Sequence, residues 1–202
     1  MTAHIVNMTR RKKDPGKREA LLTATLSLIN DNGFHAAPMS KIAKLAQVSP
    51  ATIYIYFENK QDLVNQLYLT IKEKLSLYAF KEYSPTEPVK SCFKKIWFNI
   101  ARYRMQFPQE SAFLTQCDSS PMVENPTREE ALKHLKILLD VWDRGKTEGH
   151  IKNIDPYLLY AFTLYPMSFL ITSQQRNLYT ITDGALQDAF NIAWDSIKTE
   201  IK

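Results

Sequence analysis

The chain has 202 residues, of which 45% are hydrophobic and five are glycine. This composition excludes a disordered polypeptide, and so few glycines argue against a β-rich fold, which needs them in its tight turns. The net charge of +5 lies at one end: residues 1–60 hold nine Lys and Arg against four Asp and Glu, whereas the remainder is balanced. A localised basic region is typical of a domain that binds a polyanion, although a solubilising tail would carry the same charge.

Cysteine use and hydropathy indicate where such a protein acts. Cys92 and Cys117 are the only cysteines and form no CxxC motif, so we expect reduced thiols in the cytoplasm. The basic run at residues 10–13 is not followed by an apolar segment, as a signal peptide would require. The most apolar stretch, residues 158–172, is shorter than the ~20 residues that a bilayer needs and contains Pro166. We expect no membrane association.

Hydrophobic periodicity predicts an all-α fold. Residues 1–13 show no such periodicity and are interpreted as a basic arm, and a helix is predicted over residues 17–32, ended by Gly33. Two short helices follow at residues 38–46 and 50–57, with a turn at 47–49 between them. Asn59, with Asp62 three residues later, is related to a capping box and predicts the start of a long helix.

Further helices are predicted beyond the loop at residues 84–88, over residues 88–106, 109–117, 127–146, 156–175 and 184–202. Asp155 followed by Pro156 has the pattern of an N-cap and a first-turn proline. Pro166 lies in the middle of the 156–175 helix. Because proline has no N–H, the carbonyl of Phe162 loses its helical partner, and we expect a kink with a free acceptor there.

The three short N-terminal helices suggest a helix-turn-helix, which needs a small residue where its helices touch, a tight turn and apolar anchors. Ala43 is the small residue and Gln47 occupies the turn, while the anchors are Ile42, Val48, Ile53 and Phe57. Any packing of three helices would use these anchors. The next helix opens with Ser49, Pro50, Ala51 and Thr52, whose short side chains and free N–H groups allow close approach to a phosphate. Tyr54 and Tyr56 then place hydroxyls within reach of the major groove.

At these residues the sequence resembles the TetR family of transcriptional regulators. The resemblance rests on Ile42-Ala43 and on the run Val48–Leu63, and it is specific over residues 18–63. It implies that Thr52, Tyr56 and Lys60 hold phosphates, that Tyr54 reaches a phosphate or a base edge, and that Ser49, Pro50 and Ala51 face the groove. We add Lys41 to this predicted DNA-binding surface.

Two positions depart from the family pattern. Gln47 stands where the family has a turn glycine, and a left-handed backbone there costs a non-glycine residue ~1–2 kcal/mol. Ala37 and Pro38 replace the usual Ser or Thr cap of the second helix, so a hydrogen bond worth ~1 kcal/mol is expected to be missing. Proline at the first helical position offsets part of this loss.

No catalytic or metal-binding pattern stands out. His4, His35, His134 and His150 share no ligand spacing, and five scattered glycines build no phosphate-binding loop. We therefore expect no enzyme activity, no metal site and no cofactor.

The C-terminal part is rich in aromatic residues on predicted inner faces. They indicate either plain core packing or a cavity beside the Pro166 kink for a small hydrophobic or aromatic effector carrying one donor, or for a cation. The residues predicted to line this effector site are Phe93, Trp97, Phe113, Trp142, Phe162, Tyr165 and Phe169.

The last two helices carry apolar surface that we interpret as a two-fold, four-helix dimer interface, with one apolar stripe on the last helix. Its members are Leu186, Phe190, Ala193 and Ile197. The prediction is therefore a homodimeric regulator with a helix-turn-helix domain at residues 1–62 and a helical effector-binding and dimerisation domain at 63–202. The resemblance implies repression of transcription that a small ligand relieves. The helix that begins at Lys60 would transmit the effect of the ligand to the DNA-binding domain. A protein-interaction module and a DNA-binding activator without a ligand remain the alternatives.

Overall fold

The computed structural model describes residues 14–200, so the predicted arm at residues 1–13 lies outside the described residues. Within that range the regular structure is helical apart from one isolated bridge between Ile151 and Lys198. The fold is all-α, as predicted. The chain divides into two compact units, Met1–Leu63 and Val64–Lys202, called here the N-terminal and C-terminal units.

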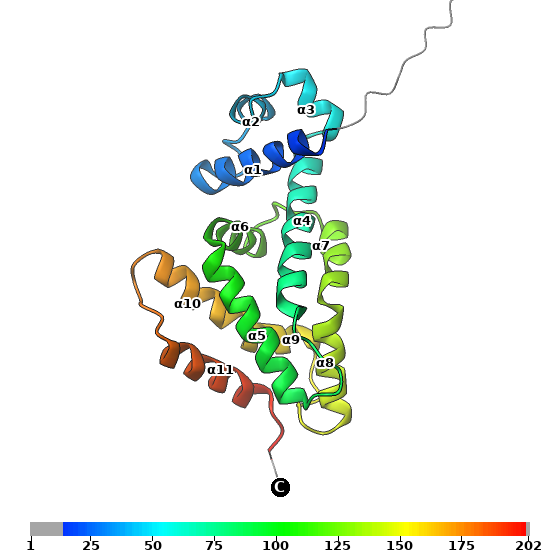
Figure 1. Ribbon diagram of the computed structural model, residues 1–202, viewed down its shortest axis with the longest axis vertical. Helices are drawn as coiled ribbons and strands as arrows, with labels where there is room; N and C mark the ends of the chain where they lie inside the picture. Colours follow the sequence, from blue (N-terminus) through cyan, green and yellow to red (C-terminus); the bar gives the residue numbers. More distant parts are fainter. Residues whose placement is uncertain (1–13, 201–202) are drawn as a thin grey trace, which may run out of the picture. The chain divides into compact units, whose positions relative to one another are not determined.

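The N-terminal unit contains α1 (Pro15–Asn32), α2 (Met39–Leu45) and α3 (Pro50–Tyr56), with α2 packed against both of the others (Figure 1). Side chains cap two of these helices. The Asp14 carboxylate accepts a hydrogen bond from the N–H of Gly16, and the Ser49 hydroxyl accepts one from the N–H of Thr52. The cap position of α2 is Pro38, which offers no such hydrogen bond, and this confirms the predicted missing cap.

The turn between α2 and α3 depends on a left-handed residue. Gln47 has a φ of 56°, so it occupies the conformation that glycine would adopt without strain. Ile42, Ala43 and Ile53 have no exposed surface, and Phe57 is 1% exposed. These anchors hold α2 and α3 in place despite the strain at the turn.

A long helix, α4 (Lys60–Phe80), follows. The N–H of Asp62 donates to the side-chain oxygen of Asn59 at 2.9 Å, and the N–H of Glu58 donates to the Asp62 carboxylate at 2.9 Å. These two hydrogen bonds form a relative of the capping box and confirm the capping pattern predicted at the start of the helix.

The C-terminal unit continues with seven α-helices and one short 3₁₀ helix among the described residues. They are α5 (Val89–Gln106), α6 (Pro108–Asp118), α7 (Asn125–Ala131), η1 (Leu132–Leu135), α8 (Lys136–Thr147), α9 (Pro156–Thr163), α10 (Tyr165–Gln175) and α11 (Asp183–Ile197). Helix α5 is central, because it contacts α6, α8, α10 and α11 (Figure 1). Its buried face supplies much of the core.

Two predicted helices are interrupted. The segment predicted as one helix over 127–146 consists of the end of α7, then η1 and α8, and the segment over 156–175 is divided at Leu164 into α9 and α10. The second break follows from Pro166, which cannot donate to the carbonyl of Phe162. The neighbouring carbonyl, that of Thr163, accepts a hydrogen bond from the indole N–H of Trp97 on α5 at 2.8 Å.

None of the helices among residues 14–200 combines the length and the apolar character needed to cross a membrane.

Candidate functional site

The outer face of α3 is exposed at its start and around Tyr54. Ser49, Pro50 and Ala51 are exposed, and Tyr54 is 59% exposed. Lys41, on α2, is also exposed. The short side chains at the beginning of α3 therefore leave its backbone accessible to a polyanion, as a recognition helix requires.

The other three predicted DNA contacts are half-buried and already have protein partners. The hydroxyls of Thr52 and Ser49 lie 2.7 Å apart, and the Tyr56 hydroxyl accepts a hydrogen bond from the N–H of Asp14 at 2.9 Å. Lys60 donates to the carbonyl of Phe34, and its ammonium lies 4.1 Å from the centre of the Phe34 ring. A hydroxyl that accepts can still donate, and an ammonium has three donors, so these groups are positioned rather than blocked.

The C-terminal unit contains a cavity of about 510 Å³. Helices α4, α6, α7, α8 and α9 and the short η1 contribute to its wall. The lining residues are Tyr68, Lys72, Asp118, Arg128, Ala131, Leu132, Leu135, Leu139, Trp142, Pro156, Tyr157 and Tyr160.

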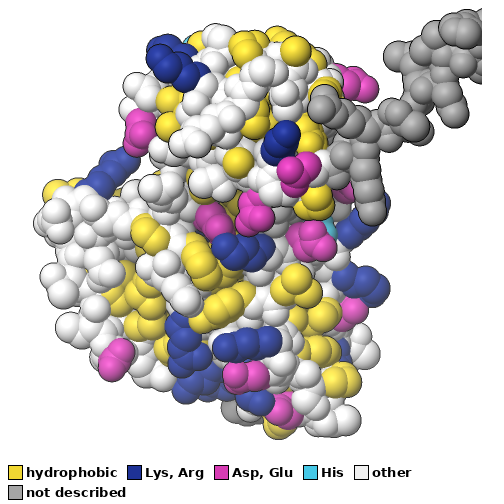
Figure 2. Space-filling model, turned by 45° about the horizontal axis from the view of Figure 1, so that its top comes forward, with side chains coloured by type: hydrophobic (Ala, Val, Ile, Leu, Met, Phe, Trp, Pro, Cys, Tyr) yellow, Lys and Arg dark blue, Asp and Glu magenta, His cyan; other side chains and the backbone are white. Residues whose placement is uncertain are grey.

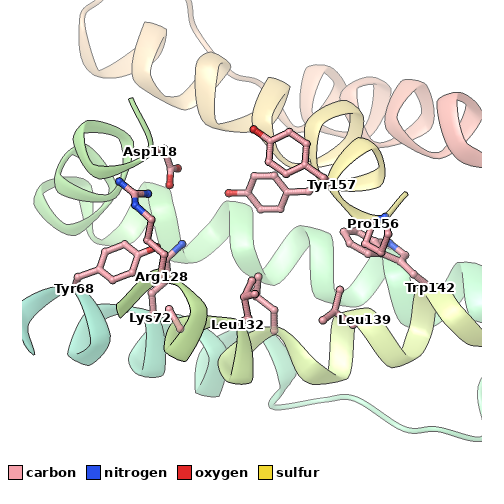
Figure 3. Close-up of a pocket in the computed structure, with 12 residues that line it drawn as sticks. Tyr68, Lys72, Asp118, Arg128, Leu132, Leu139, Trp142, Pro156 and Tyr157 are labelled. Carbon is pink, nitrogen blue, oxygen red and sulfur yellow. The ribbon is translucent and has the colours of Figure 1, made fainter. Parts of the chain in front are cut away.

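The two ends of this cavity differ in chemistry, as Figure 3 shows. At one end the charged side chains of Lys72, Asp118 and Arg128 gather around Tyr68. Toward the other end the wall is apolar, formed by Leu132, Leu139, Trp142 and Pro156. A mostly apolar cavity with polar groups at one end is the usual form of a small-molecule site.

Arg128 is held rigidly by main-chain carbonyls. Its guanidinium donates to the carbonyl oxygens of Cys117, Ser120 and Val123 at 2.6, 2.8 and 3.1 Å. Because these acceptors are neutral, they position the guanidinium without cancelling its charge. Arg128 therefore brings a fixed positive charge to the polar end of the cavity.

Burial shifts the pKa of three further groups here. Burial lowers the pKa of Lys72, with Asp118 acting in the opposite direction and Arg104 adding to the effect. Burial also raises the pKa of Tyr68 and, on the opposite wall, raises that of Tyr160 to about 12. Both phenols keep their protons at neutral pH and can donate to a ligand.

Comparison with known proteins places this architecture in a family. The family model described as bacterial regulatory proteins, tetR family, matches residues 21–67, and that described as Tetracyclin repressor-like, C-terminal domain, matches residues 88–198. The fatty acid metabolism regulator protein of Bacillus subtilis is 35% identical over 147 residues, which are 70% of this chain and 74% of that protein. The chain belongs to the tetR family.

Another relative and a solved structure agree. An uncharacterized HTH-type transcriptional regulator of Haemophilus influenzae is 30% identical over 103 residues, or 51% of this chain and 55% of that protein. A TetR family transcription regulator from Marinobacter aquaeolei VT8 superposes with a TM-score of 0.86 at 28% identity, covering 94% of this chain and 100% of that one. The protein is a transcriptional regulator with an N-terminal helix-turn-helix and a helical C-terminal domain.

In this tetR-family chain the seven residues predicted to line an effector site occupy three different environments. Trp142 lines the cavity. Phe93, Trp97 and Phe113 are buried in the core, where the ring centres of Phe93 and Trp97 lie 6.0 and 5.6 Å from that of Phe190. The other three are more than half exposed; they are Phe162, Tyr165 and Phe169.

The stripe predicted for dimerisation faces the inside of its own subunit. Leu186, Phe190, Ala193 and Ile197 are all at most 8% exposed in the single chain. They are consequently not free to contact a second copy. The spacing correctly predicts one apolar face on α11, but that face packs against α5 and α9.

Sequence reasoning missed the polar end of the cavity. Lys72 and Arg128 look like ordinary charged positions of amphipathic helices, and Asp118 ends a helix. Only the preceding apolar Ile71 and the aromatic Tyr68 hint that this side of α4 is enclosed. No local pattern places residues from α4, α6 and α7 at one point.

Proposed function

We propose that this protein is a dimeric repressor that dissociates from operator DNA when an apolar effector occupies the cavity lined by α4, α7, α8 and α9. The observation that carries the proposal is the cavity itself. Its volume of about 510 Å³ falls within the roughly 300–1,000 Å³ typical of small-molecule sites, and most of its wall is apolar.

The nature of the effector is supported by a relative and by the wall. The Bacillus subtilis relative is named for the regulation of fatty acid metabolism. A cavity with Leu132, Leu139 and Trp142 along its wall suits an alkyl chain or a flat hydrophobic body. We therefore take an acyl compound or a similar amphiphile as the effector class, acting in the cytoplasm where bacterial DNA lies.

Dimerisation is supported by a group of exposed aromatic side chains in the C-terminal unit. Phe162, Tyr165 and Phe169 are 59%, 54% and 67% exposed, and Ile192 on α11 is 71% exposed. Figure 2 shows hydrophobic side chains gathered on the left of the view, the side on which Figure 1 draws α10 and α11. A group of exposed apolar side chains of this size often marks an interaction surface, so we propose that α10 and α11 pair with a second copy.

The course of helix α4 supports a coupling between effector binding and DNA binding. It begins at Lys60 and carries Tyr68 and Lys72 in the cavity wall eight and twelve residues later. A hundredfold loss of operator affinity requires only ~2.7 kcal/mol of preference for the non-binding geometry. A modest adjustment of this helix by a ligand would be enough.

The test is release of DNA by ligand. Fluorescence anisotropy with the duplex upstream of the protein's own gene should show a preferred site, and straight-chain acids, alcohols or acyl-CoAs should lower the affinity at least tenfold. Leu139→Trp, which would fill the cavity, should bind DNA but no longer respond, whereas Leu77→Trp on the exposed side of α4 should respond normally. Binding of DNA with no response to any of these amphiphiles would favour a ligand-independent activator, and no DNA preference would favour a protein-interaction module.

A further inference from the structure

Lys72 is a buried cation that forms no ion pair within the described residues. Its side chain is 8% exposed and lines the cavity. Among residues 14–200 its ammonium makes no hydrogen bond or ion pair, and it lies 5.1 Å from the centre of the Tyr68 ring. Burying an unpaired ammonium is costly, and lysine is almost never buried unless it is paired. A partner supplied from outside the chain would remove that cost.

The groups that face Lys72 carry an excess of positive charge. Of the charges that act on Lys72, the Asp118 carboxylate on α6 has the largest effect, and Arg104 on α5 and Arg128 on α7 oppose it as cations. The adjacent Cys117 is neutral, because burial raises the pKa of its thiol to about 12. Three cations therefore share one carboxylate.

Arg104 adds to this excess because it is 3% exposed and its Nε has no hydrogen-bond partner, while its terminal nitrogen donates to Ser111 at 3.4 Å. Asp118 is exposed, so water screens its charge. The field at the polar end of the cavity consequently favours an anion.

We propose that this polar end binds the free carboxylate of an acid whose apolar body fills the rest of the cavity, with Lys72 as the residue that recognises the charge. The proposal rests on the cavity being the effector site. A carboxylate has two oxygens, which can accept from the Lys72 ammonium and from the Tyr68 hydroxyl together. One negative charge also matches the local excess better than the several charges of a nucleotide phosphate group.

The experiment is calorimetric titration of the full-length protein with decanoate, 1-decanol and decanoyl-CoA, which share one alkyl chain and differ in the head. The wild type should bind decanoate at least tenfold more tightly than 1-decanol. Lys72→Met should bring the two affinities within about twofold and leave 1-decanol binding intact, which also shows that the variant is folded. Lys72→Gln should behave in the same way. Lys133→Met, the same change at an exposed lysine on η1, should keep the preference.

Each outcome of these titrations either supports or overturns the proposal. No decanoate binding by the wild type, equal binding of acid and alcohol, or a preference that survives Lys72→Met overturns the proposal. Tighter binding of decanoyl-CoA that Lys72→Met does not alter would place the recognised charge elsewhere and overturn it too. If decanoate binds through Lys72 but does not release DNA, the proposed function fails and this inference stands. If 1-decanol releases DNA at the same concentration as decanoate, the inference fails and the proposed function stands.

Discussion

The indole N–H of Trp97 and the main-chain carbonyl of Thr163 form a buried hydrogen bond of 2.8 Å that ties α5 to the end of α9. The carbonyl is available because the helical pattern stops there: Pro166 interrupts the continuation of α9, and α10 begins at Tyr165. A break that would otherwise expose an unpaired acceptor in the core is thus closed by a side chain from another helix.

Replacing Trp97 by Phe should lower the free energy of unfolding by about 1–3 kcal/mol, because an aromatic ring still fills most of the site but the Thr163 carbonyl loses its donor. Urea unfolding followed by circular dichroism measures this. Trp142→Phe is the matched control, because the Nε1 of Trp142 is buried without a partner. It should cost clearly less, and equal losses in the two variants would mean that the hydrogen bond contributes little.

The sequence predicts features that depend on neighbours in the chain. The strained Gln47 turn, the missing cap at Pro38 and the cap at Asn59 each follow from residues within four positions. The break near Pro166 has the same origin. Trp97, which donates to the Thr163 carbonyl at this break, lies 66 residues from Thr163, and the sequence predicts it only as a wall of a cavity. Periodicity identified the apolar face of α11 but cannot say whether Phe190 meets its own chain or a second copy. For the same reason, apolar neighbours such as Tyr68 and Ile71 do not show that Lys72 itself is enclosed.

Lys60 should contribute to stability as well as to DNA binding. Its ammonium contacts both the ring and the carbonyl of Phe34, so Lys60→Ala should lower the free energy of unfolding by about 1–2 kcal/mol in the absence of DNA. Lys41→Ala, on the exposed part of α2, should weaken DNA binding and leave stability unchanged within ~0.5 kcal/mol. A Lys60→Ala protein as stable as the wild type would show that this residue serves DNA alone.

Removing the hydroxyl of Tyr54 should affect DNA binding, whereas removing that of Tyr56 should affect the structure of the N-terminal unit. Tyr54 is 59% exposed, so Tyr54→Phe should reduce affinity for the preferred duplex with no loss of stability. Tyr56→Phe removes the acceptor of the Asp14 N–H and should loosen the start of α1.

If about eight phosphates are neutralised by a dimer, log K should fall with log salt at a slope of about −7 for wild type and both variants. Anisotropy at several salt concentrations measures this, and a flat salt profile would contradict phosphate contact.

Phe169 and Phe190 should respond differently to the same change. Phe169 is 67% exposed, so Phe169→Asp should yield a folded monomer if α10 pairs with a second copy. Phe190 is 1% exposed, so Phe190→Asp should unfold the C-terminal unit instead of splitting a dimer. Sedimentation velocity with circular dichroism distinguishes the two results. A wild type that sediments as a monomer at micromolar concentration would remove the basis for this interface.

The buried ammonium of Lys72 should lower the free energy of unfolding of the ligand-free protein, compared with a variant that has an uncharged side chain at this position. Burial lowers its pKa in the native state, whereas the unfolded chain restores the ordinary value near 10.5. Between those two values the unfolded state binds more protons than the native state, so the free energy of unfolding rises with pH across that window. Below the lowered pKa both states are protonated, and the full cost of burying the ammonium remains.

Lys72→Met should therefore raise the free energy of unfolding by roughly 1–3 kcal/mol at neutral pH, and its advantage over wild type should shrink as the pH increases toward the ordinary lysine value. Urea unfolding of both proteins at a series of pH values measures the difference, in which all other titrating groups cancel. Lys133→Met should show no such trend, because that side chain is exposed in the native state. Saturating decanoate should narrow the gap at neutral pH, since a carboxylate beside Lys72 stabilises its charged form and a ligand that binds the native state stabilises it. A gap between Lys72→Met and wild type that is constant with pH would mean that Lys72 has the same pKa in the native and unfolded states, and the ammonium would then have to be solvated or paired.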